Sequence, residues 1–298
     1  MKHRTEQEML SLILGVAKKD ERVRAVWMNG SRANPMAPRD HYQDYDIVYA
    51  VDDLQSFIDD PQWVDVFGER IIMQTRDLQF DSTPPFTDWY IYLMQMMDGN
   101  RIDLNLVPVE RMREILSKDT MCVLLLDKDG KAPPLPPQSD EEFWVRKPSE
   151  REYQCTCNEF WWVSTYVVKG IWRQEMPYAY GMLSSVVIPE LLKMVRWKIA
   201  LDYDFKIDLG KMGRFIERYL YSEDWMLFAS SYSGGSYASM YAALDSACTL
   251  FRKCAREVGE ALGYSYPEED DRRVSVYLKS GGRFEKMDSL SDTTDHAE

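Results

Sequence analysis

Three aspartates occupy positions from which their carboxylates can bind the same cation. The alternation of polar and apolar residues predicts a strand over 44–51 and another over 101–107. Asp44 and Asp46 project from one face of the first strand, about 7 Å apart by strand geometry, and Asp103 lies on the polar face of the second. Carboxylates this close repel unless a cation joins them, and Mg²⁺ prefers oxygen ligands and bridges phosphates. If the strands pair, the three carboxylates converge on a site for Mg²⁺.

A short phosphate-binding signal precedes these aspartates. A strand expected over 22–28 ends in the turn Asn29-Gly30, followed by Ser31 and Arg32. Gly30 lets the backbone approach a phosphate and donate its amide, Ser31 offers a hydroxyl, and Arg32 supplies charge. Taken singly, Gly-Ser is a common turn, Asp-x-Asp is usually a solvated strand end, and Asp103 fits the polar face of an edge strand. Together, and in this order, they favour a metal-dependent site for nucleotide phosphates.

The elements that must position these residues alternate along the first half of the chain. The turn Asp98-Gly99-Asn100 predicts a hairpin between two strand-like segments. The remaining segments follow from apolar spacing and turn residues. We expect helices over 6–18, 53–67 and 110–126, strands over 70–74 and 89–97, and an irregular segment over 31–43.

A proline-rich spacer over 132–137 divides the chain. We expect one domain over 1–136, a helical domain over 137–265, and a polar, acidic, flexible tail over 266–298. In the second domain a capping box, Ser149 with Glu152, predicts the start of a long helix reaching Arg173. Further helices are expected over 180–201, 211–230 and 236–262.

One face of that long helix carries an unusual mixture of side chains, which we call the aromatic stripe. Its members recur three or four residues apart and therefore share a face. They are Asn158, Trp162, Tyr166, Lys169 and Arg173. Glu159 lies beside them. An aromatic core with a surface lysine remains the alternative interpretation.

Composition narrows the class of protein. The chain has 298 residues, with 36 basic against 49 acidic side chains and a net charge of −13, so it lacks the basic footprint of a nucleic-acid-binding protein. A negative field favours a cationic ligand. Five cysteines and three histidines form neither a disulfide framework nor a zinc cluster. Without a signal peptide or a membrane-length apolar run, a cytoplasmic protein is expected. The oligomeric state is not fixed by sequence, and we favour a monomer.

Further stretches give the chain a resemblance to a known family. Gly30-Ser31, Asp44-x-Asp46 and Asp103 resemble the signature of the DNA-polymerase-beta-like nucleotidyltransferases. The whole chain resembles the bacterial aminoglycoside 6-adenylyltransferases, which modify streptomycin. The stretches that carry this resemblance cover most of residues 6–267. They are 6–9, 43–47, 98–100 with 103–104, 124–129, 157–161, 163–170 and 250–253. Many superfamily members have a second glycine after Gly-Ser, where this chain has Asn34-Pro35.

The resemblance implies a fold, a reaction and roles for these residues. The fold is α+β, with a nucleotidyltransferase domain of mixed sheet flanked by helices, followed by a helical bundle. The reaction is transfer of AMP from ATP to a streptomycin hydroxyl, which confers resistance, with Mg²⁺ held by the aspartates. Asp103 is the expected general base and Glu159 the second candidate.

The aromatic stripe would complete the site. Lys169 would contact the triphosphate, and Asn158, Trp162 and Tyr166 the antibiotic. Two alternatives stay open, namely a nucleotidyltransferase with another acceptor, antibiotic or protein, and a nucleotide-binding regulator without catalysis.

Overall fold

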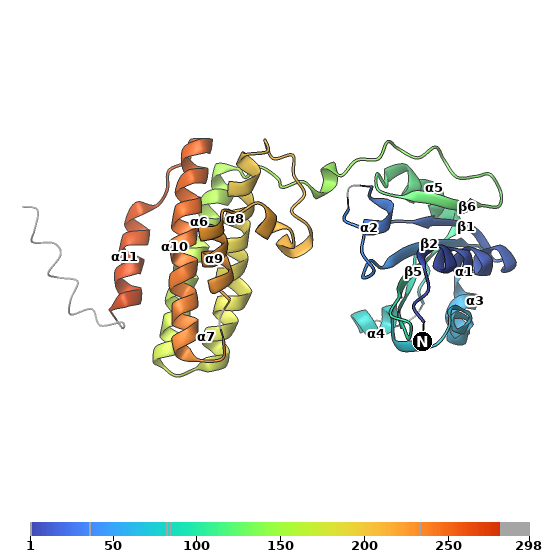
Figure 1. Ribbon diagram of the computed structural model, residues 1–298, viewed down its shortest axis with the longest axis horizontal. Helices are drawn as coiled ribbons and strands as arrows, with labels where there is room; N and C mark the ends of the chain where they lie inside the picture. Colours follow the sequence, from blue (N-terminus) through green and yellow to red (C-terminus); the bar gives the residue numbers. More distant parts are fainter. Residues whose placement is uncertain (1, 36, 82, 84, 233, 281–298) are drawn as a thin grey trace, which may run out of the picture. The chain divides into compact units, whose positions relative to one another are not determined.

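The computed structural model describes residues 2–35, 37–81, 83, 85–232 and 234–280. The chain forms two compact units, Met1–Asp140 and Glu141–Glu298. The first unit is a mixed sheet with helices, and the second is helical (Figure 1). The α+β fold expected from the sequence is therefore confirmed. No helix among the described residues is long and apolar enough to cross a membrane.

Six strands build the sheet of the first unit, in the order β3-β4-β5-β2-β1-β6. Among the strands that the structure describes, only β2 and β5 pair in parallel, and the other neighbouring strands are antiparallel. The strands are β1 (Val23–Met28), β2 (Tyr45–Val51), β3 (Arg70–Thr75), β4 (Tyr90–Met96), β5 (Arg101–Pro108) and β6 (Val123–Asp127).

The central parallel pair carries the predicted polar face. Asp46 on β2 is the direct partner of Asp103 on β5. Their neighbours alternate in burial, because Tyr45, Ile47 and Ile102 point into the main core while the two aspartates are only half-buried. The alternation along the sequence thus predicted which face each aspartate occupies.

Helices cover the two faces of the sheet unequally. The main core lies under α1 (Glu6–Lys19), α3 (Leu54–Asp59) and the 3₁₀ segment η1 (Pro61–Phe67). On the opposite face α5 (Val109–Lys118) covers a smaller core around Trp27. Asp46 shares that face with buried Val48 and Ala50 but is itself only half-buried, because the smaller core does not extend to it. The remaining short helices of this unit are α2 (Gly30–Ala33) and α4 (Arg76–Phe80).

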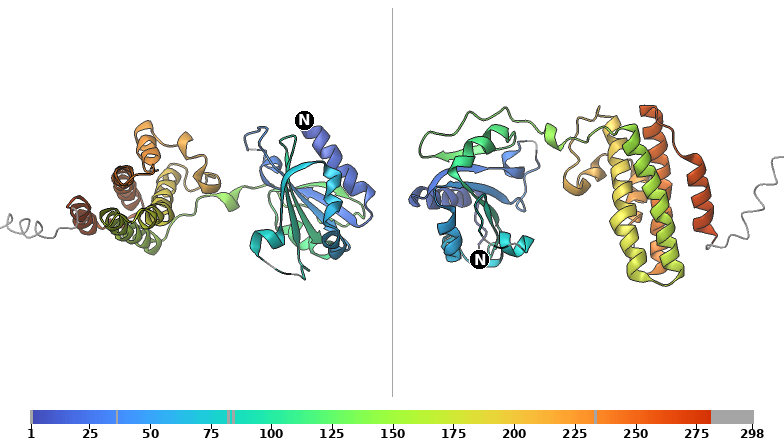
Figure 2. Two further views of the ribbon diagram at one scale, coloured as in Figure 1. Left: turned by 90° about the horizontal axis from the view of Figure 1, so that it is seen from below. Right: turned by 180° about the vertical axis from the view of Figure 1, so that it is seen from behind.

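The second unit is a bundle whose long helices α6 (Glu150–Trp172), α8 (Ile188–Leu201) and α10 (Tyr237–Leu262) run alongside one another (Figure 2). Both hydrogen bonds of the predicted capping box are present, because the Ser149 hydroxyl accepts from the Glu152 amide and the Glu152 carboxylate accepts from the Ser149 amide. The shorter elements are η2 (Glu141–Phe143), α7 (Met176–Met182), the π-helical η3 (Leu183–Val187), η4 (Lys211–Gly213), η5 (Ile216–Arg218), α9 (Ser222–Ser230) and α11 (Glu268–Lys279).

Three expectations from the sequence are corrected. The helix expected over 110–126 ends at Lys118, and the apolar residues after it form β6, which pairs with β1. The helix expected over 211–230 is two 3₁₀ turns followed by α9. The expected flexible tail begins instead with α11, which is anchored by the Asp271 carboxylate on Arg252 and Tyr266. Residues 281–298 of that tail lie outside the described part of the chain.

Candidate active site

The loop after β1 brings a glycine against one of the predicted carboxylates. Gly30 has a left-handed backbone (φ +69°), and a Cβ added there would lie 2.7 Å from Asp46 Cγ and collide with Oδ2. The Asn29 amide also donates to the Asp46 carbonyl oxygen at 2.9 Å. A residue with a side chain cannot occupy position 30 without moving Asp46. The Gly-Ser turn and the Asp46 carboxylate therefore form one local structure.

An arginine that the sequence analysis did not single out lies among the aspartates. Arg101 donates to both oxygens of Asp103, from Nε at 2.7 Å and from a terminal nitrogen at 2.8 Å. Its Nε also lies 3.7 Å from an oxygen of Asp44. The available signal was its position two residues before Asp103, since residues two apart on a strand share a face.

The negative charges of the three aspartates, which we call the carboxylate cluster, repel one another. Burial, followed by the charges of Asp103 and Asp44, raises the pKa of Asp46 to about 6. The pKa of Asp44 is also raised, first by burial, with Asp103 adding to the rise and Arg101 opposing it. Burial and mutual repulsion thus disfavour the charged form of Asp46, and Arg101 and Arg32 together offset that effect only in part.

A divalent cation suits the donors of this cluster, although the side chains are not yet arranged around one. Three carboxylates on or next to neighbouring strands supply hard oxygen ligands, and the raised pKa values of Asp44 and Asp46 indicate negative charge that lacks a sufficient partner. In the part of the chain that the structure describes, no group of three acidic, histidine or cysteine side chains has a metal-holding geometry. The guanidinium of Arg101 instead engages both oxygens of Asp103.

Arg32, which is predicted to contact phosphate, bonds to other groups of the protein in this structure. Its side chain is buried, donates to the carbonyl oxygens of Gln43 and Asp44 at 2.8–3.2 Å, and stacks over the Tyr45 ring at 3.9 Å. Its second partner is the carboxylate of Glu6 at 3.3 Å. Arg32 therefore fixes the backbone that carries Asp44. Ser31 stays half-exposed at the start of α2.

The aromatic stripe of the second unit is partly exposed to solvent, although Tyr166 is half-buried against the core of the bundle. Trp162 is 57% exposed, and its indole Nε1 donates to the Tyr166 hydroxyl at 2.8 Å. The Lys169 ammonium lies 4.6 Å from the Tyr166 ring centroid, and Asn158 and Glu159 are exposed. The core side of α6 is made by other residues, among them Tyr153, Phe160 and Trp161. The alternative that Trp162 is an ordinary core residue is therefore wrong.

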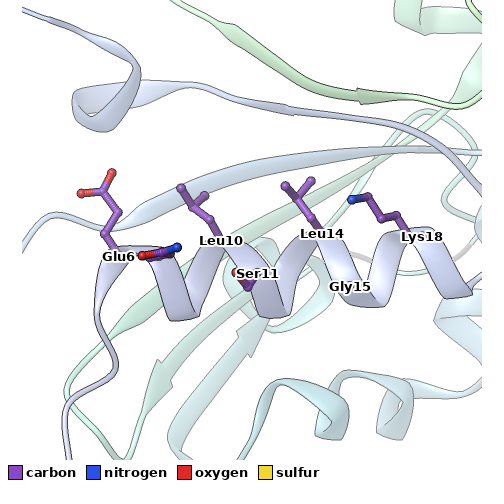
Figure 3. A pocket seen from close by; sticks show the side chains of 7 residues that line it. Glu6, Leu10, Ser11, Leu14, Gly15 and Lys18 are labelled. Atoms are coloured by element: carbon purple, nitrogen blue, oxygen red, sulfur yellow. The ribbon is translucent and has the colours of Figure 1, made fainter.

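A surface hollow of about 610 Å³ lies along α1 and contains none of the predicted site residues. The side chains of Leu10 and Leu14 point to the same side of the helix, between Glu6 and Lys18 (Figure 3). Gly15 lies in this hollow, and a Cβ there would meet no atom within 4 Å. All the residues that line the hollow belong to α1.

Comparisons with known proteins converge on one family. The model of the streptomycin adenylyltransferase family matches residues 3–281. An aminoglycoside 6-adenylyltransferase of Bacillus subtilis (strain 168) is 39% identical over 269 residues, which are 90% of this chain and 95% of that relative. One of Campylobacter jejuni is 38% identical over 277 residues, 92% of this chain and 95% of the relative. A crystal structure of an aminoglycoside 6-adenyltransferase from Bacillus subtilis aligns with 93% of this chain and 98% of its own, at 35% identity and a TM-score of 0.46.

Proposed function

Because this chain belongs to the streptomycin adenylyltransferase family and is a nucleotidyltransferase, we propose that it transfers AMP from ATP to a hydroxyl of streptomycin, releases pyrophosphate and thereby confers resistance. The observation that carries the proposal is the carboxylate cluster beside the Gly30-Ser31 turn. Binding a nucleotide without reaction would not require three neighbouring carboxylates, so a purely regulatory role is disfavoured.

The nucleotide phosphates are assigned to the loop that follows β1. Gly30 gives the backbone the close approach that a phosphate needs, and the half-exposed Ser31 hydroxyl is available as a donor. Arg32 acts as a positioning residue, since its guanidinium is committed to the carbonyl oxygens of Gln43 and Asp44. The phosphate contact that its sequence position suggested stays a prediction.

The carboxylate cluster would hold Mg²⁺. When bound, this ion would withdraw charge from the triphosphate and orient it. Asp44 and Asp46 act as its ligands, and Asp103 is both a candidate ligand and the candidate general base. The acceptor hydroxyl gives its proton to the base while its oxygen bonds to the α-phosphorus, and the bond to pyrophosphate breaks. Holding the two reactants in line supplies much of the rate enhancement.

The acceptor is proposed to be a cationic aminoglycoside. The relatives are named for aminoglycosides, and a chain with net charge −13 attracts the guanidinium groups of streptomycin. We assign the exposed Trp162 ring and the Tyr166 ring to a wall for the antibiotic, Asn158 and Glu159 to polar contacts with it, and Lys169 to the triphosphate. Glu159 is the second candidate base.

The test is release of pyrophosphate by purified protein given ATP, Mg²⁺ and streptomycin. The wild-type protein should turn over, and Asp44→Asn and Asp46→Asn should each lower the rate by at least about 100-fold, because each loses a charged ligand. Asp52→Asn changes an exposed aspartate that lies just beyond β2 and serves as a matched control. Full activity in both ligand variants would refute the metal assignment.

A panel of acceptors separates the proposed substrate from the alternative. Streptomycin, other aminoglycosides and a protein hydroxyl are compared at equal concentration with the same protein preparation. Turnover with another acceptor and none with streptomycin would retain the chemistry and replace the substrate. ATP binding without turnover on any acceptor would instead support the regulatory alternative.

A further inference from the structure

The backbone of Arg101 is anchored by the hairpin turn that precedes it. It is the first residue of β5 and follows the turn formed by Asp98 and Asn100, whose side chains bond to each other and to the backbone. Arg4 adds an ion pair to the buried Asp98 carboxylate and a further bond to the Phe67 carbonyl oxygen. The start of β5 is therefore rigid, and the Arg101 side chain extends from it over the same face as Asp103.

The guanidinium occupies the direction from which a cation would approach Asp103. Both oxygens of that carboxylate accept from Arg101, and an oxygen of Asp44 lies 3.7 Å from its Nε. A divalent ion that takes Asp103 as a ligand while this two-point contact persists must use the remaining lone pairs of the carboxylate and lie close to the positive guanidinium. The ion and the arginine thus compete for the same negative charge.

The arginine can leave without crossing the core. Its side chain is 41% exposed, whereas the side chain of Asp103 is 15% exposed. Arginine presents a planar fork that fits phosphate oxygens as well as it fits a carboxylate. A triphosphate arriving beside the carboxylate cluster would therefore offer the displaced guanidinium an equivalent partner.

We propose that Arg101 is the resident counter-cation of the carboxylate cluster, which opposes binding of a lone divalent ion and exchanges Asp103 for phosphate oxygens when a metal-bound triphosphate arrives. The inference rests on the proposed function, since it assumes a metal site at the cluster. It makes metal binding and nucleotide binding cooperative through a positioning residue. That cooperativity is reciprocal and can be measured without turnover.

The experiment measures binding of Mn²⁺ to the full chain by electron paramagnetic resonance, with and without a non-hydrolysable ATP analogue. Mn²⁺ shares the preference for oxygen ligands and is spectroscopically visible. Arg101→Gln removes the competing charge, so Mn²⁺ alone should bind roughly three- to tenfold more tightly than to wild type, as expected for a half-exposed charge pair. The analogue should tighten Mn²⁺ binding less in the variant than in wild type, because the exchange partner is lost.

Two further variants keep the result interpretable. Arg101→Lys retains the positive charge but loses the two-point contact, so its Mn²⁺ affinity should lie between those of wild type and Arg101→Gln. Arg22→Gln is the matched control, since Arg22 makes the same bidentate contact with an aspartate two residues away, Asp20, outside the carboxylate cluster. Its Mn²⁺ affinity should equal that of wild type, and thermal melts check that each variant is folded.

The outcomes distinguish this inference from the proposed function. Equal or weaker binding of Mn²⁺ alone by folded Arg101→Gln, while wild type binds Mn²⁺ with the analogue, overturns the role of Arg101 and leaves the metal site intact. Absence of Mn²⁺ binding to wild type even with the analogue overturns the metal site itself, and the inference falls with it.

Discussion

Replacing Asp46 by asparagine should make the metal-free protein more stable at neutral pH while it removes activity. The pKa of Asp46 is raised from 3.8 to about 6, first by burial and then by Asp103 and Asp44. The folded protein therefore keeps a proton on Asp46 up to about pH 6, whereas the unfolded chain releases it near 3.8. Between these values stability falls as pH rises, and above about pH 7 the whole penalty is present.

The size of the gain follows from the same numbers. At about 1.4 kcal/mol per pKa unit, the rise corresponds to at most about 3 kcal/mol at pH 7.5. Because Asp46 is only half-buried, we expect a gain of about 1–3 kcal/mol, which is a rise of about 3–10 °C in the melting temperature. At pH 4.5 the gain should shrink to about a third, because wild-type Asp46 is then largely protonated when folded and partly protonated when unfolded.

Thermal unfolding in EDTA at both pH values is the assay, and Asp98→Asn is the matched control. Asp98 is also buried, but Arg4 and Asn100 hold its pKa well below the ordinary range. Its stabilising effect is present above about pH 4 and is lost only as pH falls further, so Asp98→Asn should destabilise the protein by nearly the same amount at pH 7.5 and at pH 4.5. A loss of stability in Asp46→Asn, or a gain that does not change with pH, would refute the electrostatic reasoning.

Three further predictions concern packing, substrate and base. Gly30→Ala should lower adenylyl transfer at least about 100-fold in a pyrophosphate assay, because the new Cβ would displace the Asp46 carboxylate. The control is Gly15→Ala, whose new Cβ meets no atom within 4 Å, so it should leave activity unchanged and raise stability by up to about 1 kcal/mol. Equal activities of the two variants would exclude the proposed collision. Trp162→Ala should raise the KM for the aminoglycoside about tenfold with no change in melting temperature, because the ring is 57% exposed; an unchanged KM contradicts the substrate wall. Asp103→Asn should reduce kcat by about 10²–10⁴-fold, because the variant loses the proposed general base. Glu159→Gln should change mainly the KM for the aminoglycoside, and the reverse pattern would make Glu159 the base.

The strand faces and the long helix were predictable because local pattern and final packing agree. Asp46 and Asp103 alternate with residues that the main core buries, so the sequence alone indicated which way each points. The capping residues Ser149 and Glu152 interact with their own helix end, and no distant contact was needed to predict them.

The errors arose where a distant partner decides the structure. Residues 123–127 are apolar and fit a helix as well as a strand, and pairing with β1 selects the strand. The polar residues of α11 suggested disorder, but the buried Asp271 carboxylate with Arg252 fixes that helix. Likewise, the sequence shows that Arg32 follows Ser31, but it does not show that the guanidinium of Arg32 bonds to the carbonyl oxygens of Gln43 and Asp44.

The register between β2 and β5 ties the ligands to the folding of the sheet. Asp46 faces Asp103 across the only parallel pair of strands among the described residues. If either strand slipped by one residue, its carboxylate would turn into the main core and its apolar neighbours would be exposed, at a cost of several kcal/mol for the buried charge. The residues assigned to the metal thus help to fix the register of the two strands. Substituting both with alanine would therefore remove the energetic penalty against the slipped register as well as the binding site.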